Sequence, residues 1–517
     1  MPRQFCLTKP SHPAKLRNRW ILTSVAVLAL IPTWIKLLCY PNNIGSDDAY
    51  IHLQVARNVV SGHGWGLNAG TPVNLSSSPA FTLLLIAISH LTVHAIPVMQ
   101  VLSCIASGLG LLLIFLTVYS ETGSAYPALL AEGSASFSCN LFRWNGTVME
   151  ACCAFFVVAL LLFLFRSERV STRKFFFFGV VSGVATLLRP ELFLVTLLCT
   201  CVVAVRSDPK RRIQGAVSVL AMLAGASFCL IPWLIFARLT FHNYLPTTFY
   251  AKSYPHLIAW NPIIAKQMLE LTGESFLWPA LLLAAFGWLL LRWRVTIAWK
   301  RLLLPIGLPL GVTAFYYLKT PGLESAGRYM LPLLPCAAVA LGVICFEVAS
   351  VKESRLVVAL SIAMMSLHVV TSLAINQIYL APTVARFEEE YGATMRAAAG
   401  FIATQTSFSN EGVLVEADVG VLAYAANGRF LIYDGGGLAS PELVHLSPAE
   451  QVQLVQPAYI VESQGSEAAE WEGKDGGRLR ALWSRMYKQH SVSQTVPYLF
   501  ANVYASSLNA PDTCCAR

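Results

Sequence analysis

The chain has 517 residues, of which 56% are hydrophobic and only 13% are charged, and its formal net charge is +9. Several apolar runs reach the roughly 20 residues that a helix needs to cross a hydrocarbon core about 30 Å thick. This composition excludes a water-soluble globular protein and predicts a polytopic α-helical membrane protein, with membrane lipids as partners. The positive charge does not indicate a nucleic-acid partner, because many Lys and Arg residues lie in short connections between apolar runs, where they set orientation.

The 13 cysteines lie mostly inside the apolar runs. No C-x-x-C pair occurs in the sequence, and no His spacing is typical of a metal site. We therefore interpret the cysteines as packing residues.

Basic residues precede the first apolar run, residues 20–39, and no small-residue cleavage site marks its end. We expect a signal-anchor span whose N-terminus lies in the cytoplasm. Residues 40–96 then form a first outer loop, which carries Asp47 and Asp48 close to the membrane surface. Within this loop the apolar run 79–91 is short for a span and suits an interfacial or re-entrant helix.

If residues 79–91 do not span the membrane, the densest basic connections all fall on one side, as the positive-inside rule requires. We then expect about 11 transmembrane helices. They cover residues 20–39, 98–119, 125–142, 146–165, 175–188, 192–205, 213–239, 276–291, 302–318, 329–348 and 357–378. A second and a third outer loop are expected at 240–275 and 319–328, and residues 1–380 form the membrane domain.

From about residue 381 the composition becomes that of a soluble protein. A helical stretch comes first, and strand-like segments (GVLVEAD, RFLIYD, AYIVE and YLFANVYA) follow it with a helical PAEQVQLVQ between them. This alternation predicts a small α/β domain over residues 381–517 on the outer side of the membrane.

The predicted outer face collects acids, cations and tyrosines that are candidates for a functional site. Charged residues at a membrane face are costly and therefore suggest function. A carboxylate can take a proton from a hydroxyl nucleophile, and cations can hold a departing phosphate. The candidates are Asp47, Asp48, His52, Glu150, Arg189, Glu191, Tyr250, Lys252, Arg328 and Tyr329.

Structural roles remain open for the same residues. Ser46 followed by two acids is a favourable helix start, and His52 also suits a surface imidazole at a lipid interface. Arg189 and Glu191 would also suit a structural ion pair. Lys252, Arg328 and Tyr329 would also suit interfacial anchors. The run Gly435-Gly436-Gly437 is more typical of a turn than of a phosphate loop.

The run DDAYIHLQVARNVVSGHGWGLNAGTPVNLSSSPAFTLLL, which begins at Asp47, resembles the first outer loop of bacterial GT-C glycosyltransferases. It is most similar to the arabinofuranosyltransferase-like branch, which includes the terminal arabinosyltransferase of the mycobacterial cell wall and the pilin arabinosyltransferases. Further elements of similar sequence follow in the same order: GTVME at 146–150, LRPE at 188–191, LPTTFYAK at 245–252, GRYMLPLLP at 327–335, and Asp418-Val419-Gly420 in the C-terminal domain.

The resemblance implies a GT-C fold and an inverting transfer of a sugar, for example arabinofuranose, from a polyprenyl-phosphate donor to a glycan, lipid or protein acceptor. It implies an aspartate of the first outer loop as general base, with Asp47 as the first choice and Asp48 as the second. Arg189, Lys252 and Arg328 would bind the phosphate. Glu150, Glu191 and His52 would position sugar hydroxyls, and Tyr250 and Tyr329 complete the substrate-binding set.

No metal ligand is assigned, but Asp47 and Asp48 together are a candidate site for a divalent cation such as Mg²⁺, Mn²⁺ or Ca²⁺. The expected location is the bacterial inner membrane, with the site and the C-terminal domain in the periplasm. The alternative functions are a transporter or flippase of lipid-linked sugars and, with less support, a non-catalytic membrane scaffold.

Overall fold

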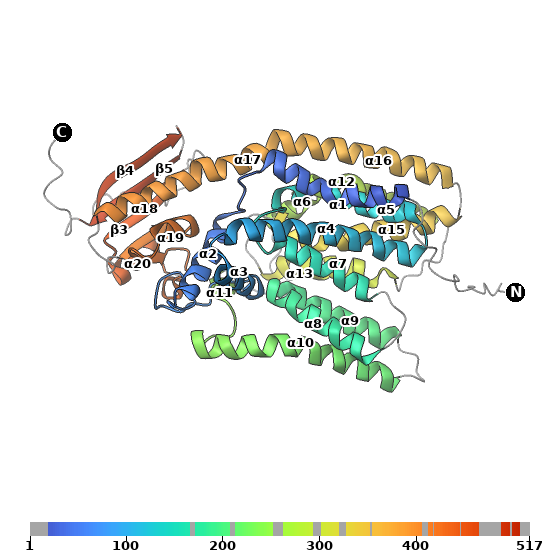
Figure 1. The fold of residues 1–517 in the computed structure, drawn as a ribbon, viewed down its shortest axis with the longest axis horizontal. Helices are drawn as coiled ribbons and strands as arrows, with labels where there is room; N and C mark the ends of the chain where they lie inside the picture. Colours follow the sequence, from blue (N-terminus) through green and yellow to red (C-terminus); the bar gives the residue numbers. More distant parts are fainter. Residues whose placement is uncertain are drawn as a thin grey trace.

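In the computed structural model the chain forms a bundle of apolar helices with a small α/β domain at one end (Figure 1). The structure describes residues 19–165, 171–206, 212–251, 262–292, 301–319, 327–351, 354–405, 412–416, 418–444, 446–464, 487–496 and 499–506. The first described helix, α1 (Arg19–Cys39), begins at the end of the bundle that is far from the α/β domain (Figure 1).

A helix occupies most of each predicted span. These helices are α1 (Arg19–Cys39), α4 (Ala95–Thr122), α5 (Ala125–Ser136), α7 (Ala151–Phe165), α8 (Thr172–Leu188), α9 (Phe193–Arg206), α10 (Arg212–Phe241), α12 (Pro262–Arg292), α13 (Leu303–Lys319), α15 (Leu334–Val351) and α16 (Ser354–Ile375). Within the described ranges, five helical segments are long and apolar enough by themselves to cross a membrane: Arg19–Cys39, Ala95–Thr122, Ile213–Phe241, Gly327–Ser350 and Arg355–Thr404.

The predicted spans 125–142 and 276–291 differ from the observed helices. The run 125–142 is interrupted after Ser136, and α6 (Cys139–Trp144) follows as a separate short helix. The run 276–291 is the second half of α12, which begins at Pro262 and kinks at Phe276, where φ is −149° and ψ is 17°. The break after Ser136 and the kink at Phe276 therefore depend on local backbone geometry, which the average hydrophobicity of a run does not show.

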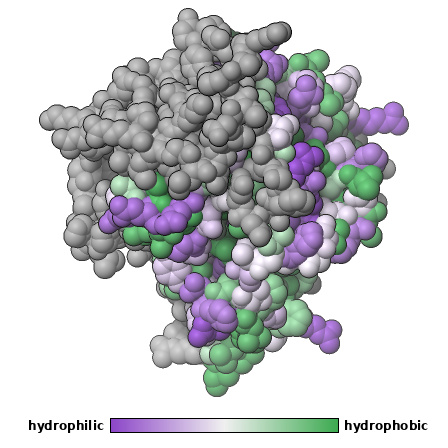
Figure 2. Space-filling view, turned by 90° about the vertical axis from the view of Figure 1, so that its left-hand side faces the viewer, coloured by the Kyte–Doolittle hydropathy of each residue, from purple (hydrophilic) through white to green (hydrophobic). Residues whose placement is uncertain are grey.

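Short helices gather at the end of the bundle that faces the α/β domain (Figure 1). They are α2 (Asp47–Val60), α3 (Pro79–Leu91), α11 (Thr247–Ala251) and α14 (Gly327–Met330). The bounds of α3 agree with the predicted interfacial run, and Pro79 begins it at the position where the missing N–H costs least. Figure 2 looks onto the side of the molecule where the α/β domain lies, and hydrophilic and hydrophobic residues are interspersed among those that it colours.

One helical segment joins the bundle to the α/β domain without a loop. It continues from α16 through a π-helical turn (Asn376–Leu380) into α17 (Ala381–Arg386), a second π-helical turn (Phe387–Gly392) and α18 (Ala393–Gln405). The predicted domain boundary at residue 380 therefore falls inside a continuous helix. π-Helical turns within longer helices occur frequently at functional sites.

The α/β domain contains a five-stranded sheet with the order β2-β1-β3-β5-β4. Its strands are β1 (Gly412–Glu416), β2 (Leu431–Asp434), β3 (Tyr459–Gln464), β4 (Tyr487–Val496) and β5 (Leu499–Ser506). β1 pairs in parallel with β2 and β3, whereas β5 is antiparallel to both β3 and β4. Four of these strands lie at the predicted segments, and β4 is an additional edge strand.

The two faces of the sheet bury different sets of residues. Leu414 and Ile460 pack with Leu443 and Val452 on one face. The neighbouring strand positions Val413, Val415 and Val461 join the core shared with α18, α19 (Gly420–Ala426) and the bundle. This alternation follows the two-residue period of a strand and seats the domain on α2 and α18.

Candidate active site

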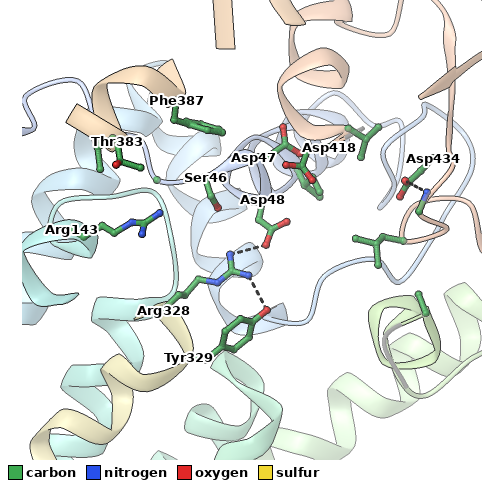
Figure 3. Close-up of a pocket in the computed structure, with 17 residues that line it drawn as sticks. Ser46, Asp47, Asp48, Arg143, Arg328, Tyr329, Thr383, Phe387, Asp418 and Asp434 are labelled. Atoms are coloured by element: carbon green, nitrogen blue, oxygen red, sulfur yellow. Dashed lines mark hydrogen bonds and ion pairs between the residues drawn. The ribbon is translucent and has the colours of Figure 1, made fainter. Parts of the chain in front are cut away.

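A cavity of about 420 Å³ lies between the end of the helical bundle and the α/β domain (Figure 3). Its walls come from segments that are far apart in the sequence: the start of α2, α6, α14, α17 and the loops after β1 and β2. The charged side chains on its walls are Asp47, Asp48, Arg143, Arg328, Asp418 and Asp434. Since such a concave site with convergent polar groups is the usual form of an active site, we treat it as the candidate.

Asp48 presents its carboxylate to this cavity. Its Oδ2 lies 2.7 Å from Nη1 of Arg328, and 37% of the Asp48 side chain is exposed. Arg328 itself is buried, and its Nη2 donates a hydrogen bond of 3.2 Å to the hydroxyl of Tyr329 (Figure 3). An accessible carboxylate therefore stands beside a fixed cation inside the cavity.

Asp47 has a different environment although it is the adjacent residue. Its Oδ2 accepts a hydrogen bond of 2.6 Å from the backbone N–H of Gly420, and its Oδ1 accepts one of 2.8 Å from Val421. Its residue exposure is only 5%. Burial, followed by the negative charge of Asp418, raises the pKa of Asp47 well above its ordinary value, against the lowering effect of the two N–H groups. Asp47 thus joins α2 to the α/β domain.

The helix start predicted at Ser46 is also present. Ser46 occupies the N-cap position of α2, and Asp47 and Asp48 are in the first turn, where the helix dipole favours acids. The Ser46 side chain makes no capping hydrogen bond to the helix. The predicted helix start is therefore confirmed, whereas a side-chain cap from Ser46 is absent.

A buried chain of charges continues from Arg328 into the bundle. Nε of Arg328 lies 3.9 Å from Oε1 of Glu150, and the same oxygen lies 2.6 Å from Nη1 of Arg189. Nε of Arg189 in turn lies 2.6 Å from Oε1 of Glu191. Buried charges persist only when opposite charges accompany them, and these alternate in sign. The predicted pairing of Arg189 with Glu191 is therefore present.

Two tyrosines complete this chain. The hydroxyl of Tyr316 accepts a hydrogen bond of 3.0 Å from Nη2 of Arg189. The ring of Tyr329 lies beside both guanidinium groups, with its centroid 4.5 Å from Cζ of Arg189 and 5.1 Å from Cζ of Arg328. Cation–π contacts of this kind hold the two arginines in place.

Two buried atoms of this chain lack a hydrogen-bond partner among the residues that the structure describes. They are Oε2 of Glu150 and Nε of Arg328. A carboxylate oxygen accepts a hydrogen bond and a guanidinium N–H donates one. Arg328 lines the cavity, whereas Glu150 does not.

His52 packs behind the two aspartates and does not line the cavity. Its Nδ1 lies 2.8 Å from Oγ1 of Thr82, and its ring meets Phe81 edge to face at a centroid distance of 5.3 Å. Burial lowers the pKa of His52, although Glu150 and Asp48 act to raise it. His52 is a core residue, which differs from the predicted surface imidazole.

The remaining predicted residues differ in whether they line the cavity. Tyr329 lines the cavity, whereas Tyr250 on α11 is 44% exposed and does not line it. Lys252 lies outside the described residues. The sequence analysis missed Thr383 and Phe387, which line the cavity from the helix that connects the two domains. Their only signal was the helical pattern across the predicted domain boundary.

The residues at the predicted cation site do not fit a divalent ion well. Both oxygens of Asp47 accept backbone N–H groups, and Oδ2 of Asp48 faces Arg328, whose charge would oppose a cation. Within the described ranges, no group of three or more His, Cys, Asp or Glu side chains is arranged to hold a metal ion. We therefore derive no chemical step through a metal.

Sequence comparisons identify no relative, since no family model and no curated protein matches the chain. Solved structures do match. The structure of ArnT from Cupriavidus metallidurans bound to undecaprenyl phosphate has a TM-score of 0.60 at 12% identity, over 95% of this chain and 99% of that chain. The apo state of the same protein has a TM-score of 0.59 at 14% identity, with the same coverage of both chains.

An oligosaccharyltransferase gives a second similar structure. The archaeal enzyme AglB from Archaeoglobus fulgidus, in complex with an inhibitory peptide and a dolichol-phosphate, has a TM-score of 0.53 at 12% identity. The match covers 96% of this chain and 75% of that chain. Because these similarities extend over nearly the whole chain, the protein has the polytopic membrane fold of the GT-C glycosyltransferases.

Proposed function

We propose that the protein is a glycosyltransferase that moves a sugar from a polyprenyl-phosphate donor to an acceptor hydroxyl. The observation that carries the proposal is the contact of 2.7 Å between Asp48 and Arg328 within the cavity. It brings together a proton acceptor and a phosphate-binding cation, the two groups that such a transfer requires. Polyprenyl-type phosphates bound to ArnT and AglB support the same donor class.

In this proposal Asp48 is the general base. Its carboxylate takes the proton of the acceptor hydroxyl as the oxygen attacks the anomeric carbon. The bond between that carbon and the phosphate oxygen breaks, and the lipid phosphate leaves as an anion. Attack opposite the leaving group inverts the configuration at the anomeric carbon. The accessible Asp48 suits this role better than the enclosed Asp47, which reverses the order expected from sequence.

Arg328 stabilises the phosphate as its negative charge develops, because charge-assisted hydrogen bonds strengthen with that charge. Arg189 supports Arg328 indirectly, because Glu150 lies between the two guanidinium groups. The ring of Tyr329 contacts both of them. Glu150 does not line the cavity, and its role in this proposal is to hold the two arginines between which it lies.

We further propose that the sugar is a pentofuranose such as arabinofuranose, on the strength of the sequence resemblance from Asp47 onward. The basic connections between spans support a site on the outer face of a bacterial inner membrane. The acceptor belongs to the class of glycans, lipids or proteins that carry a hydroxyl group at that face.

A transfer assay in nanodiscs tests the function. Radiolabelled polyprenyl-phosphate arabinofuranose and a polyprenyl-phosphate hexose are each offered with envelope extracts as acceptor. We expect product from the pentofuranose donor, with inverted anomeric configuration by NMR. Movement of the labelled lipid across a proteoliposome bilayer without any product would instead support a transporter.

A further inference from the structure

We propose that Asp47 is a positioning residue that clamps the α/β domain onto α2 and so completes the cavity around Asp48. This inference rests on the proposed function, because it assigns a task within the same site. Asp47 and Asp48 are consecutive residues in the first turn of α2, and both line the cavity. The carboxylate of Asp47 is nevertheless bound to the backbone of the α/β domain, whereas that of Asp48 pairs with Arg328 (Figure 3).

The clamp is a close and fully enclosed contact. Asp47 receives the backbone N–H groups of Gly420 and Val421 on its two carboxylate oxygens, at 2.6 and 2.8 Å. A Cβ atom at position 420 would lie 2.2 Å from the backbone oxygen of Asp47 and 2.7 Å from Oδ2. Only glycine permits this approach, so the backbone of the α/β domain is fitted to this side chain.

The clamp holds a wall of the cavity. Asp418 and Val419 immediately precede Gly420, and both line the cavity with Asp48. From the other side, the hydroxyl of Tyr391 donates a hydrogen bond of 2.8 Å to the backbone oxygen of Asp418. The segment that carries Asp418 is thus held between α2 and the helix that connects the two domains.

Further contacts of the first loop hold the same domain through residues that do not line the cavity. Arg57 donates hydrogen bonds of 2.8 Å to the backbone oxygen of Tyr424 and to Oδ1 of Asn427. Asn68 pairs with both backbone groups of Ile432 on the edge strand β2, at 2.8 and 2.9 Å. Loss of Asp47 would therefore loosen the cavity wall without releasing the whole domain.

The test compares Asp47→Asn and Gly420→Ala with the control Gly400→Ala. Gly400 lies in α18, and a Cβ there would meet nothing within 4 Å. Displacing reacting groups by about 1 Å costs about a hundredfold in rate, so we expect both clamp variants to lower kcat by tenfold to about a hundredfold. The KM for the lipid donor should change little, because Arg328 is untouched.

Two further measurements separate positioning from direct chemistry. Hydrogen exchange over residues 418–426 should become faster in both clamp variants and stay unchanged in Gly400→Ala. The double variant should lose little more kcat than either single variant, because both substitutions break the same contact. Asn68 lies outside the cavity, and Asn68→Ala should accelerate hydrogen exchange and lower kcat less than either clamp variant does.

Two results would overturn the inference. One is an Asp47→Asn protein without turnover whose exchange over 418–426 matches wild type, which would make Asp47 a catalytic residue. The other is wild-type kcat in Gly420→Ala. If wild type makes no product with any donor, the proposed function fails, and hydrogen exchange still decides whether Asp47 clamps the domain.

Discussion

Asp48 and Arg328 meet at 2.7 Å in the cavity, although one lies after the first apolar helix and the other before the tenth of the eleven predicted spans. The contact depends on how closely α14 approaches α2. The proposed chemistry therefore depends on the packing of the bundle.

Gly327→Ala should reduce transfer without removing a charge. A Cβ at this position would lie 2.0 Å from Oδ1 and 2.9 Å from Cγ of Asn140, so the Asn140 side chain and α14 must move apart. Asn140 is itself buried, so we expect α14 to shift and to carry Arg328 with it. We expect kcat/KM to fall by about tenfold to a hundredfold in steady-state assays. Gly287→Ala is the matched control, because a Cβ there meets nothing within 4 Å. Equal kinetics in the two variants would show that the position of α14 does not matter.

Arg189→Met should lower thermal stability strongly. It leaves the buried carboxylates of Glu150 and Glu191 without the cation that lies 2.6 Å from each, and breaking such a pair costs about 3–5 kcal/mol. The control is Arg301→Met. Its side chain is 37% exposed and lies 3.3 Å from Glu121 and 3.5 Å from Glu347, and such exposed pairs are worth about 0–1 kcal/mol each. Tm in detergent measures both, and similar losses would argue against a buried network.

Stability should depend on His52 below about pH 6.5. Burial lowers the pKa of His52 in the folded protein from an ordinary value of 6.5, so the unfolded chain binds a proton first as the pH falls. The contribution of neutral His52 is therefore fully present above pH 6.5 and is lost as the pH falls toward the folded pKa. We expect the Tm of wild type to fall more between pH 7 and pH 5 than that of His52→Gln. Parallel curves would contradict this.

Much of the architecture was predictable from sequence because membrane spans and strands have simple periods. Helices occupy most of every predicted span, and the α3 bounds agree with the predicted run 79–91. The interruption at 136–139 was missed because hydropathy averages over it. The strand β4 was missed because it is a polar edge strand, YKQHSVSQTV, without the apolar alternation that a half-buried strand shows.

The candidate site was predictable only as a set of residues. The sequence grouped Asp48, Glu150, Arg189, Glu191 and Arg328 on one predicted face, and the structure joins them in one chain of charges. It did not distinguish Asp47 from Asp48, because their environments depend on a backbone segment of the α/β domain. Such long-range contacts leave no local pattern in the sequence.

The measurement that tests the account most directly is donor turnover by Asp48→Asn. This change keeps the shape of the side chain and removes the base, and a general base contributes about a hundredfold to ten-thousandfold. We predict a loss of kcat in that range with binding of the polyprenyl-phosphate sugar retained, whereas Glu442→Gln, an exposed carboxylate outside the cavity, should behave as wild type. Wild-type turnover by well-expressed Asp48→Asn would contradict the assignment of Asp48 as the base.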